Sequence, residues 1–172
     1  MAIRLYLMRH ALAVERGAPG FADDARRPLT DEGKQQARKV AKGLRRLEAA
    51  FDMLLTSPYL RATQTAEQVI AVFGENLPRQ ELTALRPQAT PKDTSKVLVR
   101  FASRKRLLLI GHEPHLSAWL GEMIGGESGA RCLMKKAGVA CVEVDRLPPG
   151  PGQGTLRWLM TPKQLSWLAK SR

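Results

Sequence analysis

Five short, mainly apolar runs along the chain predict β-strands. One of them, Arg106–Ile110, is apolar at nearly every position, which is typical of a strand buried on both faces of a sheet. The last two runs flank the turn-forming segment Pro148–Gly152 and therefore predict a hairpin with a long connection. The predicted strands are Ile3–Met8, Asp52–Thr56, Arg106–Ile110, Val139–Val144 and Thr155–Met160.

Between these strands, apolar residues recur at three- and four-residue spacing and predict amphipathic helices. Thr30 is a predicted N-cap, Thr90 is another with proline at the first helical position, and a last helix is expected to start at Thr161. The apolar stripes are Ala37, Val40, Ala41, Leu44 and Leu47; Ala62, Ala66, Val69 and Phe73; Val97, Leu98 and Phe101; and Leu116, Trp119, Leu120 and Met123.

Strands that alternate with helices favour a parallel sheet covered on both faces, and the predicted hairpin adds an antiparallel extension. The chain of 172 residues is 44% hydrophobic, which is enough for one sizeable core. No repeat, low-complexity tract or long linker divides it. We therefore predict a single three-layer α/β domain over residues 1–172.

Polar residues of the kinds that take part in catalysis follow three of the predicted strands. Arg9 and His10 end the first, Ser57 follows the second and leads to Arg61, and Gly111–His112 ends the third. Each pair alone is common in ordinary structural positions. However, ligands of such sheets bind beyond the carboxyl ends of the strands. The recurrence at three strand ends therefore predicts one shared site.

Two arginines and two histidines at one sheet edge suit a doubly charged phosphoryl group. The guanidinium groups of Arg9 and Arg61 can each grip two phosphate oxygens, and Arg61 falls near a helix start, which favours an anion. A neutral imidazole can attack phosphorus and form a phosphohistidine that water hydrolyses. A second histidine, if protonated, would donate to a nonbridging oxygen. The sequence contains no Gly-rich phosphate loop and no carboxylate cluster for Mg²⁺, so we predict neither a metal nor a cofactor.

Four segments, in order, resemble the histidine phosphatase superfamily, and most closely its small branch of SixA-type phosphohistidine phosphatases. They are Leu7–Ala11, Arg27–Gly33, Thr56–Ala66 and Gly111–Leu116. The resemblance implies a mixed, mostly parallel six-stranded sheet flanked by helices, the phosphoglycerate mutase-like fold. It also implies a phosphatase whose substrate is phosphohistidine in a phosphotransfer or signalling protein.

The resemblance further implies roles for individual residues. His10 is the nucleophile, and Arg9, Arg61 and His112 hold the phosphoryl group. Arg27 lies close to the pocket and is a candidate substrate-binding residue. Ser57 is a second candidate; we expect it to support the turn rather than act as a nucleophile, because no base is expected beside it.

One departure from the family bears on the substrate. Relatives that cleave alcohol phosphates commonly carry a general acid before a leucine, and here Ala84 occupies that position; Glu81 and Glu113 are candidate substitutes. An alkoxide leaves poorly without a proton donor, whereas the nitrogen of a phosphorylated imidazole leaves more easily. We therefore favour P–N cleavage on a protein. A small phosphate ester, such as a sugar phosphate or nucleotide, is the alternative.

The net charge of +12 is concentrated in residues 26–46 and 86–106, each with a surplus of six positive charges. Such segments predict an anionic partner or substrate. A second alternative is therefore a nucleic-acid or polyphosphate-binding module without catalysis. Aromatic residues make up only 5% of the chain and are not interleaved with the bases, which disfavours nucleic acid. We expect the bases of the first helix to form a solvated face.

Localisation follows from the apolar runs and the cysteines. No run approaches the roughly 18–20 residues that cross a bilayer, and Arg4 and Arg9 interrupt the first one, unlike a secretory signal. Cys132 and Cys141 form no metal-type cluster and are expected to be small buried residues. We predict a cytoplasmic protein with reduced thiols and no membrane partner, and the oligomeric state is left open.

Other charged residues near the predicted site are expected to be peripheral. His115 is expected at the surface or at the pocket rim. Glu15, Asp23 and Asp24, in the loop after His10, are expected to be solvated.

Overall fold

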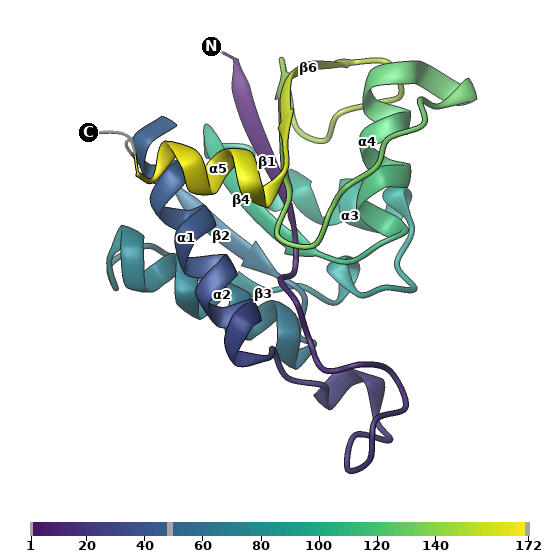
Figure 1. Cartoon of the computed structure of the whole chain (residues 1–172). Coiled ribbons are helices and arrows are strands. Elements are labelled where there is room, and N and C mark those ends of the chain that lie inside the picture. Colours follow the sequence, from purple (N-terminus) through teal and green to yellow (C-terminus); the bar gives the residue numbers. More distant parts are fainter. Residues whose placement is uncertain (1, 48–49, 171–172) are drawn as a thin grey trace.

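Six strands form one mixed sheet in the computed structural model, which describes residues 2–47 and 50–170 (Figure 1). The strand order is β3-β2-β4-β1-β5-β6. The first four strands in this order run parallel, whereas β5 is antiparallel to β1 and β6 is antiparallel to β5. Their bounds are β1 Ile3–Arg9, β2 Met53–Thr56, β3 Arg79–Glu81, β4 Arg106–Gly111, β5 Val139–Val144 and β6 Gly154–Met160.

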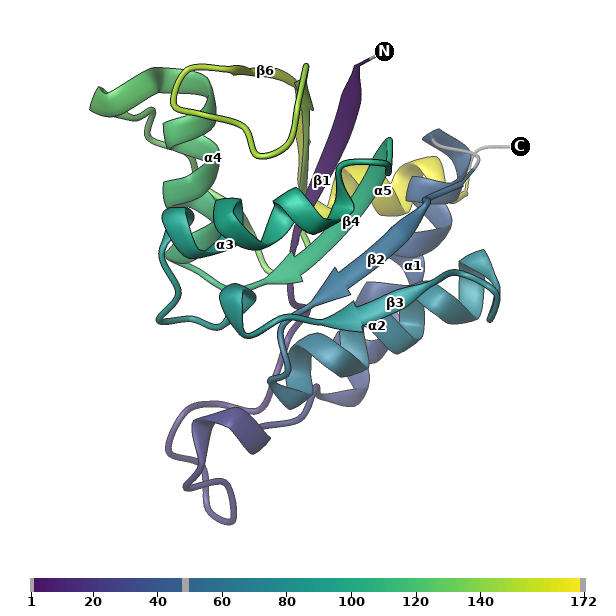
Figure 2. The same ribbon diagram turned by 180° about the vertical axis from the view of Figure 1, so that it is seen from behind.

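Helices cover both faces of the sheet. Three cover one face, α1 (Asp31–Leu47), α2 (Leu60–Phe73) and α5 (Pro162–Leu168), and two cover the other, α3 (Pro91–Leu98) and α4 (His115–Gly125) (Figures 1 and 2). Successive side chains of a strand point to opposite faces, so β1 sends Tyr6 and Met8 into one core and Leu5 and Leu7 into the other. The predicted three-layer α/β architecture is confirmed.

The predicted elements are present, with their ends shifted by about one residue. The predicted caps also form: Thr30 Oγ1 accepts a hydrogen bond from Gly33 N at 3.0 Å, and Thr90 and Thr161 each complete a capping box. The predicted third helix is shorter than expected, because α3 ends at Leu98 and a 3₁₀ turn continues to Phe101. These local signals therefore fixed the helix starts better than the helix ends.

One strand was not predicted from the pattern of apolar residues. β3 consists of Arg79, Gln80 and Glu81, pairs only with β2 among the described strands, and exposes two of its three residues. A three-residue polar edge strand has neither an apolar run nor an alternating pattern to reveal it. It supplies the sixth strand that the family resemblance implied.

The loop between β1 and α1 is fastened to the helical layer. The carbonyl of Leu12 accepts a hydrogen bond from Thr30 N at 3.1 Å, and Leu29 N donates to Gln64 Oε1 at 2.7 Å. A Cβ atom at Gly33 would lie 1.9 Å from the Leu12 oxygen, so only glycine fits there. The Arg27–Gly33 segment therefore closes this loop over the carboxyl edge of the sheet.

The basic residues of α1 lie away from the cores. Four of them, Arg38, Lys42, Arg45 and Arg46, line a groove between α1, the end of α2 and the chain beyond α5, together with Ala71, Val72 and Ala169. The exposed bases of the helix are Arg38, Lys39, Lys42, Arg45 and Arg46. The predicted solvated face is confirmed.

Over residues 2–47 and 50–170, the structure contains no helix that is both long enough and apolar enough to cross a membrane.

Candidate active site

The carboxyl ends of β1, β2 and β4 meet and bring the predicted site residues together. His10 N donates a hydrogen bond to the Gly111 carbonyl at 3.0 Å, and Ser57 N donates to the Ile110 carbonyl at 2.9 Å. These backbone bonds tie the three strand ends to one another. The side chains that gather there are buried: His10 is 7% exposed, Ser57 0%, Arg61 2% and His112 1%.

The hydrogen bonds of His10 determine which of its nitrogens can react. Nδ1 lies 2.7 Å from the carbonyl oxygen of Ala11. Because a carbonyl oxygen only accepts, Nδ1 carries the proton and Nε2 carries the lone pair. Arg61 Nε donates to this Nε2 at 3.2 Å. The lone pair is therefore directed at the guanidinium group that we expect to hold a phosphoryl group.

His112 lies beside His10 and is held by Ser57. The centroids of the two imidazole rings are 5.0 Å apart, and His112 Nε2 is 2.8 Å from Ser57 Oγ. Ser57 Oγ also accepts a hydrogen bond from Tyr59 N at 3.3 Å. The expectation that no base lies beside Ser57 is therefore wrong, because the fold brings in a histidine from another strand end. The expectation that Ser57 supports the turn is confirmed.

Arg9 and His112 each retain a buried nitrogen with no hydrogen-bond partner among the described residues, Arg9 Nε and His112 Nδ1. Another nitrogen of Arg9, Nη1, donates to the Met134 carbonyl at 3.0 Å. Buried polar groups are rarely left unpaired. These two nitrogens are therefore candidates for binding a ligand of the site.

Arg27 is connected to the site through an acid that sequence reasoning misplaced. Arg27 Nε donates to Asp24 Oδ1 at 2.8 Å, and its Nη1 donates to the Val14 carbonyl. Asp24 in turn binds Arg61. The expectation that Asp24 is solvated is therefore wrong: an acid among arginines is drawn into their ion-pair network, and only its place three residues before Arg27 signalled this.

Sequence reasoning also missed Thr65, which lies one turn after Arg61 in α2. Its Oγ1 accepts a hydrogen bond from Ala11 N at 3.1 Å and donates to the Arg61 carbonyl at 2.7 Å. Thr65 thus ties Ala11, the residue after His10, to the helix that carries Arg61. The signal was weak, because a threonine one turn along a helix is usually explained by its own backbone bond.

The three candidate acid positions have different surroundings. Ala84 is 7% exposed and its carbonyl accepts a hydrogen bond from Thr94 Oγ1 at 2.7 Å. The carboxylate of Glu113 accepts from the backbone and the hydroxyl of Ser117. Burial raises the pKa of Glu113, and the charge of Arg9 opposes that rise. Glu113 therefore caps α4 locally while lying within the electrostatic reach of Arg9.

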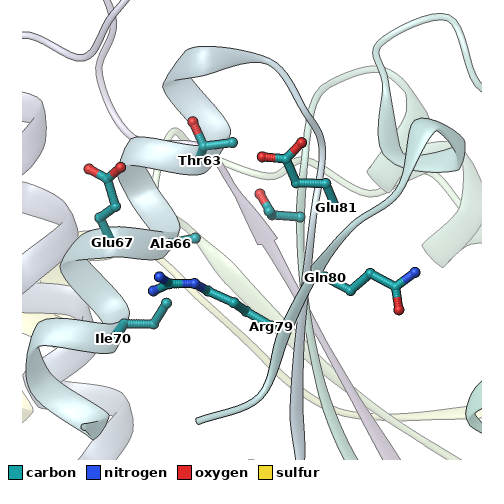
Figure 3. A pocket seen from close by; sticks show the side chains of 8 residues that line it. Thr63, Ala66, Glu67, Ile70, Arg79, Gln80 and Glu81 are labelled. Atoms are coloured by element: carbon teal, nitrogen blue, oxygen red, sulfur yellow. The ribbon is translucent and has the colours of Figure 1, made fainter. Parts of the chain in front are cut away.

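Glu81 lines a groove between α2 and β3 (Figure 3). The groove measures about 280 Å³. In the close view, the Glu81 side chain lies toward Thr63 and the start of α2, whereas Arg79 reaches across the groove toward Ile70. The lining residues are Thr56, Thr63, Ala66, Glu67, Ile70, Arg79, Gln80 and Glu81. Neither histidine of the site nor Arg61 is among the lining residues of this groove.

His115 is not at the rim as expected. It is 2% exposed, its Nε2 lies 2.9 Å from Thr94 Oγ1, and its ring is parallel to that of Trp119. The sequence pattern placed it on the first turn of a helix but could not show that α3 packs over that turn. His115 thus joins α4 to α3.

Both site histidines are neutral near pH 7. Burial, followed by the charges of Arg61, Arg9 and Lys136, lowers the pKa of His10 to about 3, although its bond to Ala11 opposes the shift. Burial and the neighbouring His10 and Arg61 lower the pKa of His112 to about 2. A neutral His10 retains the lone pair that a nucleophile requires.

These low pKa values predict a loss of stability in acid. Between pH 6.5 and about 3, the unfolded chain binds protons at these histidines and the folded chain does not, so the free energy of unfolding falls as pH falls. From pH 7 to 4.5 the loss is about 2 kcal/mol per histidine. A His10→Asn, His112→Asn double variant is expected to lose correspondingly less stability in urea unfolding at these two pH values. Equal losses would show that the histidines are not held neutral.

The described residues contain no group of three or more His, Cys, Asp or Glu side chains arranged to hold a metal ion.

Comparison with known proteins places this chain among the histidine phosphatases. Residues 5–89 match the family model of the histidine phosphatase superfamily (branch 1). The chain is 35% identical over 139 residues to an uncharacterized protein of Picosynechococcus, covering 80% of this chain and 82% of that protein. It is 28% identical over 169 residues to the phosphohistidine phosphatase SixA of Escherichia coli, covering 95% and 96% of the two chains.

Solved structures give the same relation. A structure of the protein histidine phosphatase SixA complexed with tungstate has a TM-score of 0.81 and 29% identity, covering 95% of this chain and 99% of that one. The fold itself is shared more widely: phosphoglycerate mutase from Bacillus anthracis has a TM-score of 0.67 at 16% identity, covering 99% and 97%. The phosphoglycerate mutase-like fold is confirmed.

Proposed function

Because this chain belongs to the histidine phosphatase superfamily and is a phosphatase of the SixA type, we propose that it hydrolyses phosphohistidine on a phosphotransfer or signalling protein. Residues 1–172 act as one catalytic domain, and the reaction passes through a covalent phosphohistidine at His10. The observation that carries the proposal is the junction of three strand ends, where Arg61 Nε lies 3.2 Å from His10 Nε2 and His112 lies beside them.

In the first step, the lone pair on His10 Nε2 attacks phosphorus while the bond from phosphorus to the substrate nitrogen breaks. The departing imidazole takes the electron pair of that bond and a proton from solvent. Arg61 shifts its Nε–H from His10 to a phosphoryl oxygen, and Arg9 contributes its unpaired Nε–H. Charge on the phosphoryl oxygens is thus met by fixed donors throughout the transfer.

In the second step, water attacks the phosphorus of phospho-His10, the P–N bond breaks, and inorganic phosphate and free His10 result. His112 acts as a donor in its neutral form: Ser57 donates to its Nε2, so Nδ1 carries the proton and faces a phosphoryl oxygen. This assignment replaces the protonated His112 considered from the sequence, because a pKa of about 2 leaves His112 unprotonated near pH 7. Ser57 and Arg27 are positioning residues in this scheme, acting through His112 and Asp24.

The preference for a P–N bond rests on the leaving group. Ala84 occupies the position where alcohol-cleaving relatives place an acid, and Glu113 is engaged with Ser117. A positioned acid contributes about 10²–10⁴ in rate when the leaving group is an alkoxide. The imidazole of phosphohistidine leaves without that help. The relationship to E. coli SixA, a phosphohistidine phosphatase, supports the same substrate.

The substrate class is tested by comparing kcat/KM for a phosphohistidine peptide, p-nitrophenyl phosphate and an alkyl or sugar phosphate, all in chelator. We expect the phosphohistidine peptide to exceed the alkyl phosphate by about 10²–10⁴. The p-nitrophenyl ester is expected to lie between them, because its leaving group needs little protonation. Fast cleavage of sugar phosphates without P–N cleavage would establish the small-ester alternative.

The binding-module alternative is tested in the same preparation. Binding of DNA to a basic surface falls steeply with salt. Salt-sensitive DNA binding that persists in a His10→Ala variant, combined with no phosphatase turnover in the unmodified protein, would favour that alternative.

A further inference from the structure

Asp24 lies at the centre of an arginine network beside the proposed nucleophile. Its Oδ1 accepts hydrogen bonds from Arg27 Nε at 2.8 Å and Arg16 Nε at 3.3 Å. Its Oδ2 accepts from Arg61 Nη2 at 3.1 Å, and its backbone carbonyl accepts from Arg61 Nη1 at 2.6 Å. One residue of the β1–α1 loop thus contacts three arginines with three acceptor oxygens.

The two edges of the Arg61 guanidinium group have different partners. The end formed by Nη1 and Nη2 grips Asp24, whereas the side that carries Nε faces His10. A guanidinium group is planar, with five N–H donors in fixed directions. Fixing one edge therefore fixes the direction of the other. With its end bound to Asp24, Arg61 presents its Nε side to the position that phosphorus would occupy.

Asp24 also remains charged under ordinary conditions. Burial alone would raise the pKa of this carboxyl, but the hydrogen bond from Arg27 and the charge of Arg61 outweigh burial and lower the pKa to about 2. Side-chain exposure is 27% for Asp24 but only 3% for Arg61. Arg61 is thus the partner from which water is mainly excluded, and a charge-assisted hydrogen bond is stronger where water is excluded.

We propose that Asp24 is a positioning residue that orients Arg61 toward the phosphoryl group bound at His10. The proposal rests on the proposed function only in that Arg61 binds a phosphoryl group, and it holds for any phosphorylated substrate. It also gives a role to the contact between the β1–α1 loop and α2, because the loop carries Asp24, which orients Arg61 of α2.

The test is a double-mutant cycle of Asp24→Ala and Arg61→Ala, measured as kcat/KM with p-nitrophenyl phosphate and as affinity for orthovanadate by calorimetry. Asp24→Ala alone is expected to lower kcat/KM by about 10- to 100-fold, the range of a lost charged hydrogen bond. In the Arg61→Ala background, the same change is expected to have less than about a threefold effect, because contacting residues are non-additive. Asp24→Asn keeps an acceptor oxygen and is expected to lose less than Asp24→Ala.

The matched control is Glu15→Ala, which removes an exposed acid from the same loop and is expected to leave both measurements unchanged. Equal effects of Asp24→Ala in both backgrounds would overturn the proposal, because Asp24 would then act independently of Arg61. An unchanged Asp24→Ala variant would overturn it as well. Failure of the substrate proposal is separate: it would appear as absent phosphohistidine cleavage, while the ester and orthovanadate measurements still report on Asp24.

Discussion

Replacement of His10 by alanine is expected to abolish both turnover and the covalent intermediate. Without the Nε2 lone pair, the proposed bond from His10 to phosphorus cannot form, and the loss of turnover is expected to be about 10⁴-fold or more. The unmodified protein, mixed with a ³²P-labelled phosphodonor, is expected to yield an acid-labile, alkali-stable adduct that maps to His10. The alanine variant is expected to yield none.

Two companion variants make this result specific to chemistry. His10→Asn keeps a polar side chain near the Ala11 carbonyl and is expected to be as inactive as the alanine variant. This result would show that the loss of activity does not come from a packing defect. His112→Asn retains the nucleophile and is expected to form the adduct, only more slowly. Unchanged turnover in either His10 variant, or an adduct on another residue, would refute the covalent mechanism at His10.

The sequence allowed us to predict that distant residues meet at one site, because the ends of the strands can be recognised from the apolar runs. His10, Ser57 and His112 each follow an apolar run, and parallel strands deliver their carboxyl ends to a common edge. Arg61 follows Ser57 closely enough to start the next helix there. This prediction requires only the order of the elements in the sheet and no detail of the loops. The sheet places Ser57 and His112 at the same edge but does not say which side-chain atoms meet there, so the hydrogen bond between them could not be predicted.

Loops and polar edges were predicted less well. Asp24 has the composition of a solvated loop residue, and its ion pair with Arg61 spans 37 positions. β3 is a strand because β2 offers it an open edge, and not because its own residues prefer strands. His115 is buried because α3 covers it. In all three cases, the deciding contact is made by another part of the chain. Apart from the arginine three residues after Asp24, no local pattern indicated the outcome.

The asymmetry between the two histidines has a physical consequence for the reaction. The Ala11 carbonyl fixes His10 at Nδ1, and the only tautomer compatible with that bond leaves on Nε2 the lone pair that we propose as the nucleophile. His112 is fixed by a hydroxyl, which can either donate or accept. In the proposed mechanism, a phosphoryl dianion that approaches Nδ1 of His112 therefore selects the tautomer that donates to it. The tautomer of His10 is thus fixed by the fold, whereas in the proposed mechanism that of His112 depends on the bound anion.

Replacement of Arg61 by alanine is expected to lower kcat/KM by about 10³–10⁵, the range for an arginine that stabilises phosphoryl-transfer charge. Arg61 is 2% exposed and directs Nε at His10, so water cannot readily replace it. Arg61→Lys keeps the charge but loses the planar fork, and we expect it to recover only part of the loss. Steady-state kinetics with p-nitrophenyl phosphate, together with orthovanadate affinity, measure both variants.

Arg27→Ala is the matched comparison, because Arg27 shares Asp24 with Arg61 but is connected to His10 only through Asp24 and Arg61. Its loss leaves Asp24 still bound to Arg61, so we expect a decrease of only about tenfold, the size of one weakened charged bond. A network that merely held the loop would make the two alanine variants equally harmful. A much larger loss at Arg61 than at Arg27 would instead locate the phosphoryl group on the side of the guanidinium that faces His10.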